Sequence, residues 1–258
     1  MTRNFKLTLA YDGTSFVGWQ RQAKGKSVQG LLEDALARFE GAPVVVHGAG
    51  RTDAGVHALG QVASVRLTCA HDATIIARGV NAELPDEVRL TAVDETALDF
   101  RARYSAKSKT YRYLLRNSPF ASPFERGYVW HVPEPLDLDT MRAAAAAVPG
   151  SHDFSAFQST GSNVGSTIRT MARSEFFTDP GRTLSGLAGE ADTARPTSPT
   201  DALLVYEIEG DGFLRHMVRA IVGTLVEIGY GGRSLGSLST LLTGGARSQA
   251  GPTAPAHG

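Results

Sequence analysis

A single carboxylate stands in a glycine-rich stretch of the chain, "GAGRTDAGVHALGQV", which spans residues 48–62. The carboxylate belongs to Asp53, and Arg51 lies two residues before it. A guanidinium at that spacing can keep the aspartate ionised and oriented, while the flanking glycines let a bulky substrate approach the backbone. An ionised aspartate beside a cation is suited to attack or deprotonate a substrate with an electrophilic carbon. The residues alone do not identify that carbon.

This stretch has three other interpretations. An aspartate among glycines is often a turn residue whose carboxylate bonds its own backbone, and this interpretation stays open. A phosphate-binding loop needs a G-x-G-x-x-G pattern or a Lys-Ser/Thr pair at the start of a helix, and neither is present here. A metal site could use His47, Asp53 and His57, but no further ligand-spaced pair supports it. We therefore expect no metal site and no nucleotide-binding loop here.

The composition is that of a globular protein. The chain has 258 residues, of which 42% are hydrophobic and 20% are charged, enough for one large or two small domains. Its only cysteine, Cys69, excludes an internal disulfide and a zinc ribbon. The first apolar run stops at Asp12, too early for a signal peptide or a membrane span. We expect a cytoplasmic protein that does not bind membranes.

Charge is sorted along the chain although the total is balanced. Lys plus Arg and Asp plus Glu each number 26, which gives a net charge of zero. Residues 101–116 nevertheless contain six basic side chains and no acidic one, whereas residues 86–99 contain five acids and one arginine. Because phosphate binding depends on local charge, this pattern predicts a basic face.

Hydrophobic periodicity predicts a helix followed by strands in each half of the chain. In the first half we expect strands at residues 5–11, 44–47, 61–67 and 87–93, and helices at 27–39 (with Ser27 as N-cap) and 73–81. In the second half we expect strands at 110–116, 166–177 and 203–209, a helix at 138–148, and a long apolar helix within 212–230. The repeated order predicts an α+β fold with mostly antiparallel sheets in two similar units, residues 1–105 and 106–258. Small and polar residues at 178–201 predict a mobile surface loop.

Six sequence blocks in a fixed order carry a resemblance to a known family. Besides the Asp53 block, they are "YDGTSFVGWQRQ" (11–22), "VNAELP" (80–85), "FRARYSAKSKTYRY" (100–113), "HDFSAF" (152–157) and "FLRHMVRAIVGTLVEIG" (213–229). Over nearly its whole length the chain resembles the TruA-type tRNA pseudouridine synthases. The resemblance implies the pseudouridine synthase fold, with two α/β units flanking a central basic cleft and the catalytic aspartate loop in the first unit.

The resemblance also implies a reaction and roles for particular residues. The family isomerises uridine to pseudouridine at positions 38–40 of the tRNA anticodon arm, without a cofactor, as a homodimer with one tRNA reaching across both subunits. Asp53 falls on the catalytic aspartate, Tyr111 on the ring that stacks on the flipped base, and Arg219 on an arginine that bonds the aspartate. Arg51 would bind phosphates or the carboxylate. The candidates for RNA-backbone contacts are Arg21, Lys24, Lys26, Arg101, Arg103, Lys107, Lys109 and Arg112.

Two segments depart from the family pattern. The loop at 178–201 is longer than the usual connection. The family's "A-P-x-G-L-Y-L" segment is represented by "TAPAHG" at 253–258, so we expect the second unit to lack the family's final strand. That expectation supports an alternative hypothesis, a catalytically weak or silent tRNA-binding protein on the same scaffold.

Overall fold

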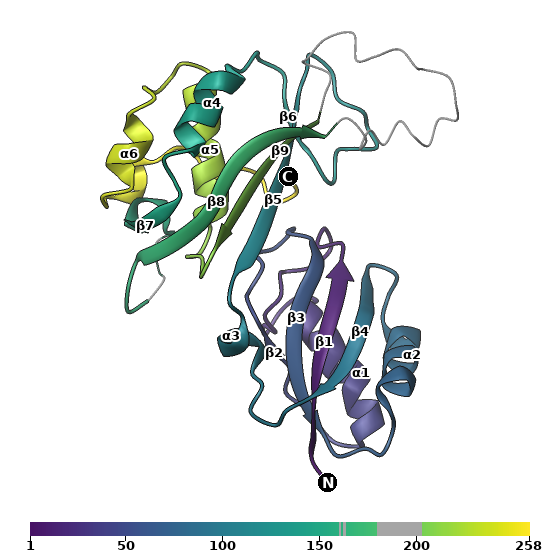
Figure 1. The fold of residues 1–258 in the computed structure, drawn as a ribbon. Helices are drawn as coiled ribbons and strands as arrows, with labels where there is room; N and C mark the ends of the chain where they lie inside the picture. The colour runs from purple at the N-terminus through teal and green to yellow at the C-terminus, as the bar shows by residue number, and fades with distance from the viewer. Residues whose placement is uncertain (160, 162–163, 180–202) are drawn as a thin grey trace. The chain divides into compact units, whose positions relative to one another are not determined.

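The computed structural model describes residues 1–159, 161, 164–179 and 203–258. The chain forms two compact units, Met1–Lys107 and Ser108–Ala256. Each unit has its own sheet, and the fold is α+β, as predicted (Figure 1). Each unit also has its own hydrophobic core. Of the loop predicted at 178–201, residues 178 and 179 belong to a strand, and residues 180–201 lie outside the described part of the chain.

The first unit contains a four-stranded antiparallel sheet in the order β2-β3-β1-β4 (Figure 1). Its strands are β1 (Arg3–Tyr11), β2 (His47–Gly48), β3 (Ala58–Leu67) and β4 (Val88–Thr96). Phe5, Leu7, Leu9 and Tyr11 alternate along β1 and are all buried, because successive side chains of a strand point to opposite faces. The buried face packs against two helices of this unit.

Helices α1 (Val28–Glu40) and α2 (Ala73–Glu83) cover that face. The short α3 (Ala102–Ser105) packs on the other face, where the N–H of Ala102 donates to Ser64 Oγ at 3.2 Å. The α1 helix begins where predicted, because the Ser27 hydroxyl accepts a hydrogen bond from the backbone N–H of Gly30. It ends at Gly41, which adopts the left-handed conformation with φ of 73°. The α2 helix begins after Asp72, whose carboxylate caps the N–H of Ile75. The α3 helix packs against β2 and β3.

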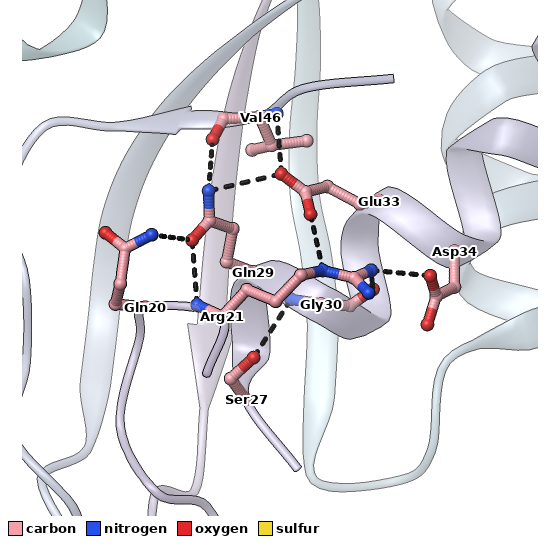
Figure 2. A network of polar contacts seen from close by, with 8 residues as sticks. All are labelled: Gln20, Arg21, Ser27, Gln29, Gly30, Glu33, Asp34 and Val46. Carbon is pink, nitrogen blue, oxygen red and sulfur yellow. Dashed lines mark hydrogen bonds and ion pairs between the residues drawn. The ribbon is translucent and has the colours of Figure 1, made fainter. Parts of the chain in front are cut away.

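The strand predicted at residues 44–47 is wrong for all but its last residue. Only His47 and Gly48 pair with β3. The N–H of Val46 instead donates to Glu33 Oε1 at 3.1 Å, and its carbonyl accepts from Gln29 Nε2 at 2.9 Å (Figure 2). Two side chains of α1 therefore satisfy the backbone groups that a neighbouring strand would otherwise bind.

The second unit contains a five-stranded sheet in the order β6-β5-β9-β8-β7 (Figure 1). Its strands are β5 (Lys109–Asn117), β6 (Trp130–Val132), β7 (Gly150–Asp153), β8 (Ile168–Asp179) and β9 (Leu203–Gly210). The pairing of β5 with β6 is parallel, and the other pairings are antiparallel. The sequence did not predict β6 or β7, because three or four residues are too few to display an alternating pattern.

The helices of the second unit complete its core. They are α4 (Leu138–Ala145), α5 (Met217–Gly229) and α6 (Ser237–Leu241), with short 3-10 turns at Ser155–Phe157 and Arg247–Gln249. The α4 helix ends three residues before the predicted position 148, because the N–H groups of Ala147 and Val148 bond carbonyls three residues back. The α5 helix is buried on almost every side. In the described part of the chain, no helix has the length and apolarity needed to span a membrane.

Candidate active site

Asp53 lies in the loop of residues 49–57 that connects β2 to β3, which we call the Asp53 loop. The loop is fixed where it leaves β2, since the N–H of Ala49 donates to the carbonyl of Val62 at 2.7 Å. The side chain of Gln61 donates to the carbonyl of Gly50 at 3.1 Å. Both partners belong to β3, so the sheet itself anchors the first residues of the loop.

Thr52, next to Asp53, is held through both its backbone and its side chain. Its carbonyl accepts a hydrogen bond from the N–H of Trp19 at 3.1 Å. Its hydroxyl lies 2.8 Å from the hydroxyl of Tyr11. Burial raises the pKa of Tyr11, while the hydrogen bonds from Thr52 and Gln61 oppose the rise. The phenol therefore stays protonated at neutral pH and remains a stable partner for Thr52.

Glycines outside and inside the Asp53 loop permit this close packing. Gly18 has φ of +109°, and a Cβ on it would lie 2.6 Å from the carbonyl oxygen of Thr52. A Cβ on Gly13 would lie 2.1 Å from the carbonyl oxygen of Val56. Gly55 has φ of +79°, in the turn that the Val56 N–H closes on the Asp53 carbonyl. Larger residues would push the loop away from the chain segment that supports it.

The two predicted polar residues of the loop differ in exposure. Asp53 is half-buried and Arg51 is exposed. The carboxylate is thus partly accessible to a ligand while its backbone is fixed on both sides. A partly exposed carboxylate on a rigid loop can act as a nucleophile or a base.

Tyr111 and Arg219 belong to the second unit. Tyr111 lies on β5, half-buried, with its ring 4.8 Å from that of Phe213 at an angle of 70°. Tyr113, on the same face of β5, is buried, and its hydroxyl donates to the carbonyl of Pro255 at 2.7 Å. The two tyrosines therefore lie on one face of the strand, and the Tyr111 ring packs against Phe213 on one side.

Arg219 projects from α5 and is held by the C-terminal residues. Its Nε donates to the carbonyl of Ala254 at 2.7 Å, and the N–H of Ala254 donates back to the carbonyl of Arg219 at 3.0 Å. Burial raises the pKa of Tyr113, and the positive charge of Arg219 opposes this rise. The guanidinium therefore lies near the Tyr113 hydroxyl. Arg51 and Asp53 belong to the first unit, and Tyr111 and Arg219 belong to the second.

Comparison with known proteins identifies the family. A family model described as tRNA pseudouridine synthase matches residues 8–105 and 144–258. The tRNA pseudouridine synthase A of Acetivibrio thermocellus is 40% identical over 256 residues, covering 99% of this chain and 96% of that protein. The tRNA pseudouridine synthase A of Solidesulfovibrio magneticus is 43% identical, covering 98% of this chain and 87% of that protein.

The chain belongs to the tRNA pseudouridine synthase family. Membership makes it an isomerase that acts on uridines of tRNA. Asp53, Arg51 and Arg219 lie within the residues that the family model matches, whereas Tyr111 lies in the unmatched interval 106–143. The resemblance found from the six sequence blocks is confirmed.

Two of the synthase's predicted RNA-backbone contacts are engaged with carboxylates. Arg21 bonds Glu33 and Asp34 of α1. Arg112 pairs with Glu207, whose buried carboxylate also binds Arg173 at 2.5 Å. These partners neutralise much of the field that each guanidinium would present to a phosphate.

The remaining six predicted contacts differ in exposure. Lys24 and Lys26 are exposed in the segment before α1, Arg101, Arg103 and Lys107 are exposed around α3, and Lys109 is half-buried at the start of β5. The guanidinium of Arg103 lies 5.9 Å from the ring centre of Tyr104. Because α3 packs on β2 and β3, Arg103 and the N-cap residue Arg101 lie in the same unit as the Asp53 loop.

The sequence reasoning missed the residues that support the loop. They are Tyr11, Gly13, Gly18, Trp19, Gln29, Glu33 and Gln61. The two glycines in "YDGTSFVGWQRQ" are the available signal, since glycine favours close approach of two backbones. Within the described residues, no cluster of three or more His, Cys, Asp or Glu side chains could hold a metal ion.

Proposed function

We propose that this synthase converts uridine to pseudouridine at positions 38–40 of the tRNA anticodon arm, with Asp53 as the catalytic nucleophile. The observation that supports this proposal most is the Asp53 loop itself. A half-buried carboxylate stands on a backbone that Trp19, Gly18 and β3 hold in place, within residues that match the family. Fixed geometry of this kind lowers the entropy cost of reaching the substrate.

The reaction is an isomerisation and needs no external oxidant or reductant. The bond between N1 of uracil and C1′ of ribose breaks, the uracil turns, and a bond forms between C5 and the same C1′. The proton on C5 is lost to solvent and N1 gains one, so atoms and electrons balance. In the proposal the Asp53 carboxylate attacks the nucleoside and is released at the end, and Arg51 binds the surrounding phosphates or the carboxylate.

The target uridine has to leave its stack before Asp53 can reach it. Extrusion of a base costs a few kcal/mol, and stacking on an aromatic ring returns roughly 1–3 kcal/mol. We assign this stacking to Tyr111, because Phe213 supports its ring edge-on and the ring remains half-exposed. Arg219, fixed by Ala254, is assigned to the polar groups around the flipped nucleotide.

The rest of the tRNA is held by charge. We assign its phosphates to the exposed cations Lys24, Lys26, Arg101, Arg103 and Lys107, together with Lys109.

We further propose that the synthase works in the cytoplasm as a homodimer that binds one anticodon arm across both subunits. Light scattering of the free protein and of its tRNA complex measures both stoichiometries.

Replacement of Asp53 tests the central assignment. Asp53→Ala should abolish release of tritium from tRNA labelled at uracil C5. Its affinity for tRNA should stay within about three-fold of wild type, because phosphate contacts dominate binding. Turnover near the wild-type level in this variant would contradict the proposal. Tight binding by the wild-type protein without any tritium release would instead favour the silent tRNA-binding alternative.

A further inference from the structure

We propose that Gln29 and Glu33 of α1, together with Arg21, form a positioning network for the Asp53 loop. The network joins two chain segments that support the loop from different sides. This inference rests on the proposed role of Asp53. It adds positioning residues that do not contact the substrate, and it gives Arg21 a role other than binding RNA.

The first segment is Val46, which directly precedes β2; β2 in turn leads into the Asp53 loop. Glu33 Oε1 accepts the Val46 N–H at 3.1 Å, and Gln29 Nε2 donates to the Val46 carbonyl at 2.9 Å (Figure 2). Gln29 is 8% exposed, and the side chain of Glu33 is 11% exposed. Both backbone groups of Val46 thus depend on two nearly buried side chains of one helix.

The second segment is the stretch that supports Thr52. The backbone N–H of Trp19 donates to Thr52, and the Trp19 carbonyl accepts the N–H of Gln29 at 3.0 Å. Two residues later, the N–H of Arg21 donates to Gln29 Oε1 at 2.9 Å, and Arg21 Nε donates to Glu33 Oε2 at 2.7 Å (Figure 2). The side chains that fix Val46 therefore also fix the segment carrying Trp19.

The chemistry of the network explains why these residue types are required. The Gln29 amide makes all the hydrogen bonds that it can. Its oxygen accepts from Gln20 and Arg21. Its nitrogen donates to Val46 and Glu33. The two oxygens of Glu33 divide between Val46 and Arg21. Removal of either side chain leaves a polar backbone group near the loop without its partner.

The network also changes the expectation for Arg21. Besides Glu33, its guanidinium binds the carboxylate of Asp34 and the carbonyl of Gly30 at 2.9 Å. A phosphate contact and a positioning role predict different measurements. Loss of a phosphate contact weakens tRNA binding and lowers its salt dependence. Loss of a positioning residue lowers kcat and leaves both quantities unchanged.

The experiment compares Arg21→Ala, Gln29→Ala and Glu33→Ala with wild type on a tRNA substrate. We expect each to lower kcat roughly 10- to 100-fold, as small misplacements of a catalytic group do. The tRNA dissociation constant should stay within about two-fold, with an unchanged salt slope. Weaker binding with a smaller salt slope and normal kcat for Arg21→Ala would overturn the proposal, as would normal kcat in all three variants.

Conservative and control variants separate positioning from general loss of structure. Glu33→Gln keeps an oxygen for the Val46 N–H and should recover part of the kcat lost in Glu33→Ala. No recovery would count against the proposal, and this variant also serves if Gln29→Ala does not fold. Arg38→Ala removes the Arg38–Glu83 ion pair elsewhere on α1 and should leave kcat unchanged.

The same set of variants distinguishes two kinds of failure. If Asp53→Ala is inactive while the network variants are fully active, only the positioning inference fails. If Asp53→Ala is active, the proposed function fails whatever the network variants do.

Discussion

At the scale of single residues, the stacking role of the Tyr111 ring can be tested separately from its hydroxyl group. Tyr111→Phe should keep most of the activity, because the ring that packs on Phe213 is retained. Tyr111→Leu should lose about 1–3 kcal/mol of stabilisation of the flipped base, which corresponds to about 5- to 150-fold in kcat/KM. The measurement is kcat/KM for pseudouridine formation in both variants.

A control residue is available in the same unit. Phe120 is highly exposed and lies outside β5, so Phe120→Leu should leave kcat/KM unchanged. Equal activity of Tyr111→Phe and Tyr111→Leu would show that the ring is not a stacking platform.

A buried phenol predicts how stability depends on alkaline pH. Burial raises the pKa of Tyr206, although its hydrogen bond with Ser174 opposes the rise. The folded state therefore keeps this proton, while the unfolded chain releases it above about pH 10. Its contribution to stability is complete below that pH. It is then lost as pH rises, at about 1.4 kcal/mol per pH unit for one proton.

Urea unfolding between pH 8 and 11 checks this expectation. Tyr206→Phe should be less stable at pH 8, because Ser174 loses its partner. Its free energy of unfolding should then fall less steeply above pH 10 than that of wild type. Identical slopes in the two proteins would show that Tyr206 is not the group that couples folding to alkaline pH.

At the scale of elements, a substitution where the β1–α1 connection contacts the Asp53 loop should lower both stability and activity. Gly18→Ala adds a Cβ 2.6 Å from the Thr52 carbonyl oxygen at a residue with φ of +109°. We expect a loss of about 1–3 kcal/mol in the free energy of unfolding from backbone strain. Since Thr52 precedes Asp53, kcat should fall by about 10-fold or more.

Gly60 on β3 provides the matched control. A Cβ there meets nothing within 4 Å, so Gly60→Ala should leave kcat and the free energy of unfolding close to wild type. Thermal melts and initial rates of both variants decide the comparison. Normal rates for Gly18→Ala would mean that the connection does not position the loop.

Elements long enough to show a hydrophobic period could be predicted from the sequence. The α1 helix combines an apolar stripe with an N-cap at Ser27, and β1 shows clean alternation. Prediction failed where the backbone is satisfied by side chains from elsewhere, as at Val46. It also failed for β6 and β7, where the elements are too short for a period to appear.

The candidate active site, too, could be predicted only in part from the sequence. Asp53 and Arg51 could be proposed from the sequence because a short local motif carries their chemistry. The supports of the loop were not, because they depend on contacts between residues far apart in the chain. The hydrogen bond of Trp19 to Thr52 and the contact of Gly13 with Val56 are examples. Such contacts become evident only when the fold is known.

At the scale of the whole molecule, binding should depend on salt despite a net charge of zero. The logarithm of tRNA affinity should fall linearly with the logarithm of salt concentration, with a slope of about −0.7 to −0.9 per neutralised phosphate. Combining Lys24→Gln with Lys26→Gln should reduce that slope by about 1 to 2. Filter binding at salt concentrations from about 50 to about 300 mM measures this slope.

The control for this measurement is Arg38→Gln, because Arg38 already pairs with Glu83. It should leave the slope unchanged. If the tRNA affinity of the wild-type protein did not change with salt, the exposed cations would not contact RNA. The clustering of basic residues at 101–116 would then need another explanation.

The chain has two tryptophans, and each unit contains one of them. Trp19 lies in the first unit against Gly48 and Tyr11, and Trp130 lies in the second unit with its ring 6.1 Å from that of Tyr113. The molecule therefore supplies its own pair of optical reporters. Replacing either indole with phenylalanine would leave a fluorophore that senses a single unit, so emission spectra could reveal which half melts first without any added dye.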